Sequence, residues 1–134
     1  MNINNTPLDG AALGEGATIL IVEDEFLIRI MLSENLIELG YNVLEACNAD
    51  EALGVLVQSA PELVVTDIRM PGTMDGLGLH ARIRNTHPAL PIIIVSAHTD
   101  YLATLDEQTQ FIPKPYPFDM LSEVVRHTLQ PKAT

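Results

Sequence analysis

The sequence is short of several residue types, and each shortage argues against a class of protein. Only 7 Lys and Arg stand against 18 Asp and Glu, which gives a formal net charge of −11. So acidic a chain lacks the basic surface that supplies most of the phosphate affinity of nucleic-acid binders, and we expect no direct binding to DNA or RNA. The single Cys47 excludes an internal disulfide and fits a reducing compartment.

Long apolar runs are also missing. No run approaches the roughly 18 residues that a membrane span needs, and the opening MNINNTPLDG has neither a basic nor an apolar leader segment. We therefore expect a cytoplasmic protein with no membrane segment. The 134 residues, 47% of them hydrophobic, suffice for one domain with one core.

Short apolar runs are what the sequence does contain. Residues 1–17 are small and polar and predict a flexible tail, 18–130 form the domain, and 131–134 are a second tail. Runs without alternation predict strands that are covered on both faces. There are four such runs and a weaker fifth: TILIV (18–22), YNVLEA (41–46), ELVVTD (62–67), PIIIVSA (91–97) and TQFIPK (109–114).

Segments with helical spacing separate these runs. The first, residues 25–39, ends before Gly40 and has an expected core stripe of Ile28, Met31, Leu32, Leu36 and Leu39. The second begins at Asn48 as N-cap, has Glu51 three residues later, and carries Ala52, Leu53, Leu56 and Val57. Residues 77–83 and 117–129 predict two more, the last with proline in its first turn. The alternation predicts an α/β fold with a parallel sheet and right-handed crossovers.

Acids, a hydroxyl and a lysine stand where the predicted strands end. Glu23 and Asp24 follow the first strand, Asp67 ends the third, and Ser96 and Lys114 end the fourth and fifth. Ligands of open parallel sheets bind at this edge, and neighbouring strand ends lie roughly 5 Å apart. Clustered carboxylates oppose ionisation unless a hard cation joins them, and Mg²⁺ is the natural one.

This set of groups suits phosphoryl transfer. A transferred phosphoryl group needs positive charge and hydrogen-bond donors, and Asp67 would be the nucleophile that forms an aspartyl phosphate. Taken singly, each residue has an ordinary explanation: a strand-end Asp is usually a turn or cap residue, and Lys114 between two prolines could simply be exposed. Such residues at four different strand ends together favour the functional interpretation.

Four segments resemble the receiver domain of two-component response regulators: LIVEDE (20–25), VVTDIRMPGTMDG (64–76), PIIIVSA (91–97) and FIPKPY (111–116). The resemblance covers about residues 18–130. It implies a single flavodoxin-like (βα)5 domain with strand order 2-1-3-4-5.

The resemblance also implies roles for the strand-end residues. Asp67 is the phosphoacceptor, Asp24 and Asp67 are direct Mg²⁺ ligands together with the backbone carbonyl of Arg69, and Glu23 acts through water. Lys114 pairs with the phosphoryl group. Ser96 is the switch hydroxyl, and its movement vacates space into which the aromatic Phe111 rotates.

The implied partners are proteins. The phosphoryl group comes from a histidine kinase or a histidine phosphotransfer protein, and the receiver catalyses both its own phosphorylation and its own reset. Phe26, Ile30 and Ile37 form a second apolar stripe on the first helix, which we interpret as the docking face for that donor. The alternative is that the stripe packs on the tail or on a neighbouring helix. The downstream partner is unknown, and we expect a monomer or weak homodimer.

The chain departs from the family pattern in two places. One extra residue stands between Pro71 and Asp75, and Lys114 follows Ser96 by only 18 positions without the usual Gly-Ala turn. We therefore expect a short or irregular fourth helix within 98–110. Arg69 and His98 lie near the path of the attacking water, where they either tune the phosphoryl lifetime or are simply solvated.

Two other functions compete with this interpretation. Haloacid-dehalogenase-like hydrolases also use an aspartyl nucleophile, but they place a second acid two residues later, where this chain has Arg69. A pseudo-receiver that never takes phosphate would not need Asp24, Asp67, Ser96 and Lys114 all intact. We expect a single-domain regulator, and the alternative is a receiver excised from a longer protein.

Overall fold

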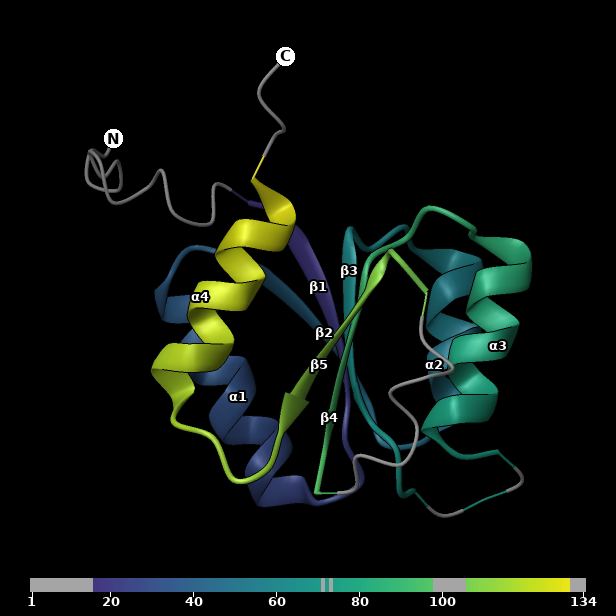
Figure 1. The fold of residues 1–134 in the computed structure, drawn as a ribbon, viewed down its shortest axis with the longest axis horizontal. Coiled ribbons are helices and arrows are strands. Elements are labelled where there is room, and N and C mark those ends of the chain that lie inside the picture. Colours follow the sequence, from purple (N-terminus) through teal and green to yellow (C-terminus); the bar gives the residue numbers. More distant parts are fainter. Residues whose placement is uncertain (1–15, 71, 73, 98–105, 131–134) are drawn as a thin grey trace.

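Five parallel strands form one sheet in the computed structural model, which describes residues 16–70, 72, 74–97 and 106–130 (Figure 1). Their order across the sheet is β2-β1-β3-β4-β5, as predicted. The strands are β1 (Thr18–Val22), β2 (Asn42–Ala46), β3 (Leu63–Asp67), β4 (Ile92–Ser96) and β5 (Thr109–Pro113).

Helices cover both faces of this sheet. In Figure 1, α1 and α4 lie on one face, and α2 and α3 lie on the other. Their bounds are α1 (Phe26–Glu38), α2 (Ala49–Gln58), α3 (Gly76–Thr86) and α4 (Phe118–Leu129). The flavodoxin-like α/β fold is thereby confirmed. None of these described helices is long and apolar enough to cross a bilayer.

Some of the predicted segments fall outside the described residues. The short or irregular helix expected within 98–110 falls largely on 98–105, which lie outside them, and residues 106–108 form a turn before β5. Most of both predicted tails is likewise outside. Gly16, at the end of the first tail, donates its backbone N–H to the carbonyl of Gly40 at 3.1 Å.

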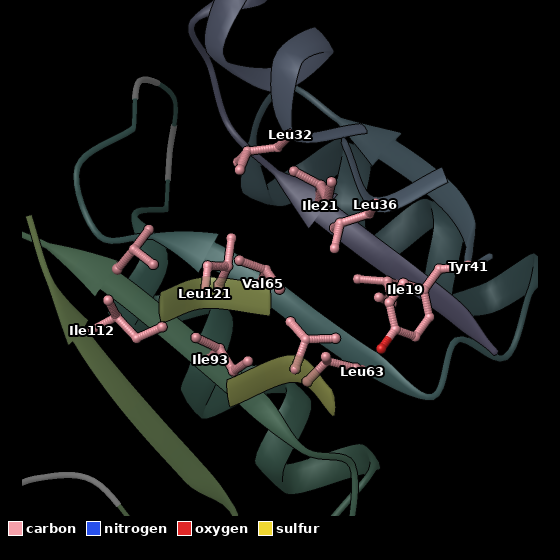
Figure 2. Close-up of a cluster of buried hydrophobic side chains, with 12 residues drawn as sticks. Ile19, Ile21, Leu32, Leu36, Tyr41, Leu63, Val65, Ile93, Ile112 and Leu121 are labelled. Carbon is pink, nitrogen blue, oxygen red and sulfur yellow. The ribbon is translucent and has the colours of Figure 1, made fainter. Parts of the chain in front are cut away.

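The continuous apolar runs form the centre of the core. β3 and β4 are buried along their whole length, and alternate residues of β1 point to opposite helix layers. Ile19 and Ile21 belong to the cluster under α1 and α4, whereas Leu20 and Val22 belong to the cluster under α2 and α3. Figure 2 shows the first cluster, in which side chains from the sheet converge with Leu32 and Leu36 of α1 and with Leu121 of α4.

The helix ends follow local hydrogen-bond chemistry. Asn48 caps α2 as predicted, accepting the Glu51 N–H at 2.7 Å, and the Glu51 carboxylate accepts the Cys47 N–H at 2.6 Å. Asp75 caps α3 by accepting the Gly78 N–H at 2.9 Å, so α3 begins at Gly76 and is longer than the predicted 77–83. Pro117 is the N-cap of α4, outside its first turn.

The prediction of which helix residues are buried is wrong at three positions. Ile28 and Met31 of α1 are 36% and 62% exposed, and Val57 of α2 is 85% exposed. The first turn of α1 lies at the carboxyl edge of the sheet (Figure 1), where little of the sheet is left to cover it. α1 therefore buries a narrow stripe of Leu32, Ser33 and Leu36. Val57 lies about 100° around α2 from the buried Leu56, beyond its buried face.

Candidate functional site

The strand register brings the predicted site residues to one edge of the sheet. Val22 of β1 is paired with Thr66 of β3, so the residues that follow them, Glu23 and Asp67, come next to each other. Asp67 is paired with Val95 of β4, and Ser96 is paired with Pro113 of β5, directly before Lys114. The four strand-end groups thus follow one another across the sheet.

Asp67 is the centre of this edge. Its side chain is only 12% exposed, and Oδ2 lies 2.5 Å from Nζ of Lys114. The other oxygen, Oδ1, accepts the backbone N–H of Ile68 at 2.6 Å and that of Arg69 at 3.3 Å. Both oxygens of the proposed phosphoacceptor are therefore held in place.

Lys114 is fixed at the same edge. Its backbone N–H donates to the Ser96 carbonyl at 2.9 Å, and its peptide bond to Pro115 is cis. Burial by itself lowers the pKa of Lys114, but the hydrogen bond that its ammonium donates to Asp67 and the charges of Asp67 and Glu23 outweigh this and raise the pKa. The ammonium therefore stays charged at neutral pH.

Glu23 adds a buried carboxylate beside this pair. It is 3% exposed, and Oε2 accepts the N–H of Glu25 at 3.0 Å. Burial raises the pKa of Glu23, and the negative charges of Asp67 and Asp24 raise it further, while the Glu25 N–H and Lys114 oppose this. The pocket thus holds more negative charge than Lys114 alone balances. Asp24, the next residue, is exposed.

The donor set fits Mg²⁺. Among the described residues, no three His, Cys, Asp or Glu side chains gather closely enough to hold a metal by themselves. Mg²⁺ does not need three, because it is usually bound by one or two carboxylates and keeps several waters. Asp24 and Asp67, with the backbone carbonyl of the exposed residue Arg69, offer this kind of set.

The two predicted switch residues lie in different surroundings. Ser96 is 1% exposed at the end of β4. Phe111 of β5 is half-buried and packs against the cluster under α2 and α3. His98 lies outside the described residues.

Several residues at the site escaped the sequence analysis. A Cβ on Gly76 would lie 2.0 Å from the carbonyl oxygen of Asp67 and 2.7 Å from Cα of Ile68, so only glycine allows α3 to begin this close to β3. Tyr116 is half-buried beside Lys114, and its burial raises its pKa. Arg29 contacts the Glu23 backbone. The only sequence signal for Gly76 is its place directly after the cap residue Asp75.

The predicted stripe on α1 is largely accessible. Phe26 is 61% exposed and Ile37 is 54% exposed, while Ile30 is partly buried. Leu27 (72%) and Met31 (62%) are exposed as well, so the apolar surface on the first two turns of α1 is wider than predicted and adjoins Glu23 and Asp24.

Comparison with known proteins places the chain in a family. Residues 19–126 match the response regulator receiver domain. The chain is 35% identical over 113 residues to the DNA-binding transcriptional regulator NtrC of Salmonella typhimurium, covering 81% of this chain and 24% of that protein. It is 31% identical over 120 residues to the sporulation initiation phosphotransferase F of Bacillus subtilis, covering 86% of this chain and 95% of that protein.

A solved structure agrees. The response regulator TrrA from Thermotoga maritima, in complex with Mg²⁺-BeF, superposes with a TM-score of 0.77 at 36% identity, covering 84% of this chain and 99% of that chain. Receiver domains take phosphoryl groups from histidine kinases and phosphotransferases and are signalling modules rather than conventional enzymes. The chain belongs to the response regulator receiver domain family of two-component phosphorelay signalling.

Proposed function

We propose that this protein accepts a phosphoryl group on Asp67 from a histidine kinase or histidine phosphotransfer protein, and that this changes its partner-binding surface. The observation that carries the proposal is the pair formed by nearly buried Asp67 and charged Lys114, 2.5 Å apart at the carboxyl edge of the sheet. The Mg²⁺-BeF complex of TrrA supports the same chemistry.

The chain's own groups account for the transfer. A carboxylate oxygen of Asp67 forms the bond to phosphorus as the phosphorus–nitrogen bond to the donor histidine breaks. The Lys114 ammonium pairs with the new phosphoryl group and offsets part of its negative charge. Asp24, Asp67 and the backbone carbonyl of Arg69 would hold Mg²⁺, with Glu23 acting through water, and the bound ion would supply positive charge to the phosphoryl oxygens.

The added phosphoryl group explains why Ser96 and Phe111 would move. The phosphoryl group gives Asp67 a charge of about −2 and strong acceptor oxygens. We propose that Ser96 moves to donate to one of these oxygens and that Phe111, which is only half-buried, turns further inward. The altered surface around β4 and β5 would bind an unidentified downstream protein.

Substituting Lys114 tests the chemistry. Lys114→Met removes the cation but leaves Asp67, and we expect phosphorylation by acetyl phosphate to slow about 100-fold, the usual loss for one charge-stabilising donor. Arg126→Met is the matched control, since it removes a cation that pairs with Glu123 on α4. Equal rates in wild type and Lys114→Met would contradict the role of Lys114.

We propose that Phe26, Ile30 and Ile37 dock the phosphodonor protein. The exposure of Phe26, three residues after Glu23, and of Ile37 in the last turn of the same helix supports this. Ile37→Ser should slow transfer from the donor protein and leave the rate with acetyl phosphate unchanged, because the small donor needs no docking surface. Val57→Ser, on the exposed face of α2, is the control. Loss of both rates in Ile37→Ser would argue against docking.

Location and assembly belong to the same proposal. The unpaired thiol of Cys47 is compatible with a reducing compartment such as the cytoplasm. We further propose a monomer or weak homodimer that signals by binding other proteins.

A further inference from the structure

Arg29 is a largely buried cation that the phosphoryl chemistry does not use. Its side chain is 15% exposed, and its Nε lies 3.1 Å from Oε1 of Glu45 on β2. Its Nη1 donates to the backbone carbonyl of Glu23 at 2.8 Å. Its guanidinium also lies over the ring of Phe26, with Cζ 5.5 Å from the ring centroid. One side chain thus joins β2, the end of β1 and the start of α1.

Glu45, the carboxylate that binds Arg29, is itself held in place. The second carboxylate oxygen of Glu45 accepts the hydroxyl of Ser33 at 2.9 Å, and Ser33 is 2% exposed on the buried face of α1. Glu45 is therefore held by two groups of α1 and keeps Arg29 directed toward the strand end. The planar guanidinium can bind a carboxylate and a carbonyl at once because its donors point in different fixed directions.

The group that Arg29 holds is the peptide that joins Glu23 to Asp24. The N–H of Glu23 is bonded to the carbonyl of Ala46 at 3.0 Å, and its carboxylate caps the N–H of Glu25. Arg29 adds the hold on the Glu23 carbonyl. Asp24 follows directly and its own side chain is exposed, so the direction of its carboxylate depends on how firmly this peptide is oriented.

We infer that Arg29 is a positioning residue for the metal site: it orients the Glu23–Asp24 peptide and so presents the Asp24 carboxylate to Mg²⁺. The inference rests on the proposed function, in which Asp24 is a ligand. Groups that support metal ligands from behind typically contribute 10- to 100-fold to metal affinity or activity.

Charge and geometry make opposite predictions here. If Arg29 acted only through its positive charge, it would repel Mg²⁺, so that its removal would tighten binding and Arg29→Lys would change nothing. If it acts by orientation, both substitutions weaken binding. A lysine keeps the charge and the pair with Glu45 but lacks the second fixed donor for the Glu23 carbonyl.

The test is a titration of Mg²⁺ alone into the full, unphosphorylated chain, followed by the amide resonances of Asp24 and Asp67. We expect the dissociation constant to rise about tenfold in Arg29→Met and to rise in Arg29→Lys as well. Arg126→Met, which removes the same charge from an exposed pair on α4, should bind Mg²⁺ as the wild type does. Urea unfolding midpoints of all variants show that each is folded.

The outcomes distinguish a failure of the positioning role of Arg29 from a failure of the proposed function. Tighter binding in Arg29→Met with no change in Arg29→Lys would overturn the positioning role and leave only a charge effect. Wild-type affinity for Mg²⁺ in both Arg29→Met and Arg29→Lys would also overturn the positioning role. If wild type itself showed no Mg²⁺-dependent shift at Asp24 or Asp67, the proposed function would fail first. If Arg29→Met did not fold, Arg29→Lys would decide the matter.

Discussion

Replacing Asp106 by asparagine removes the centre of a polar cluster at the edge of the sheet opposite the phosphorylation site. The Asp106 carboxylate lies 2.7 Å from Nε of Arg84 and 3.1 Å from Nε2 of His80 on α3. It also accepts the hydroxyl of Thr109 at 2.7 Å and the backbone N–H of Gln108 at 2.9 Å. The cluster ties α3 to the turn before β5, where the usual Gly-Ala turn is missing.

The size of the effect follows from the pKa of Asp106. Burial acts to raise this pKa, but the hydrogen bonds from Arg84 and Thr109 and the charge of Arg84 outweigh it, and the pKa falls from 3.8 to about 2. At 1.36 kcal/mol per unit, this shift corresponds to about 2 kcal/mol. The side chain is 34% exposed, so solvent screening reduces the contribution to about 1 kcal/mol.

The sign of the pH dependence is fixed by the direction of the shift. A carboxylate with a lowered pKa stabilises the fold above its unfolded pKa, and this stabilisation is lost as pH falls through the folded value. Asp106→Asn should therefore lower the free energy of unfolding by about 1 kcal/mol at pH 7. The difference from wild type should shrink between pH 4 and pH 2.

Urea unfolding at a series of pH values measures this directly. Glu123→Gln, on the exposed side of α4, is a control that should leave the unfolding midpoint unchanged. A difference between wild type and Asp106→Asn that stayed constant from pH 7 to pH 3 would refute the reasoning, because the ionised carboxylate would then not be its source.

Two further predictions concern packing. Gly76→Ala should destabilise the fold by about 1–3 kcal/mol, because its Cβ would meet the backbone of Asp67, as urea unfolding would show. Gly54→Ala, where a Cβ meets nothing within 4 Å, should stabilise α2 by about 0.5–1 kcal/mol, and equal effects at the two glycines would contradict this account. Leu36→Ala should cost about 2–5 kcal/mol and Val57→Ala almost nothing, since Leu36 is fully buried and Val57 is 85% exposed.

The strands could be predicted because each is a local apolar run, and their order because the topology of a parallel sheet is restricted. The runs at 63–65 and 92–95 are apolar without alternation, and the strands that contain them are buried along their whole length. Short strands that alternate with helices leave few arrangements of a parallel sheet. The receiver motifs then selected one order among them, which the sheet confirms.

The strand-end groups could be located for the same reason. Asp67, Ser96 and Lys114 each end a predicted strand, and the register of a parallel sheet then places them along one edge. Their roles in phosphoryl transfer rest on the family resemblance and stay predictions.

The features that could not be predicted from the sequence depend on how the helices pack against the sheet. Helical spacing alone assigns Ile28 and Met31 to the core, since it contains no information on where the sheet ends beneath α1. The closeness of Gly76 to Asp67 and the contact of Arg29 with the Glu23 carbonyl are set by how α1 and α3 pack on the strand ends. No residue spacing encodes these distances.

The most direct test of the central claim is the intact mass of the protein after incubation with acetyl phosphate and Mg²⁺, beside an Asp67→Asn control. We predict a gain of one phosphoryl group that requires Mg²⁺ and is absent from the control. If no gain appeared, and a phosphohistidine donor and beryllofluoride also had no effect on wild type, Asp67 would not be a phosphoacceptor and the account would be contradicted.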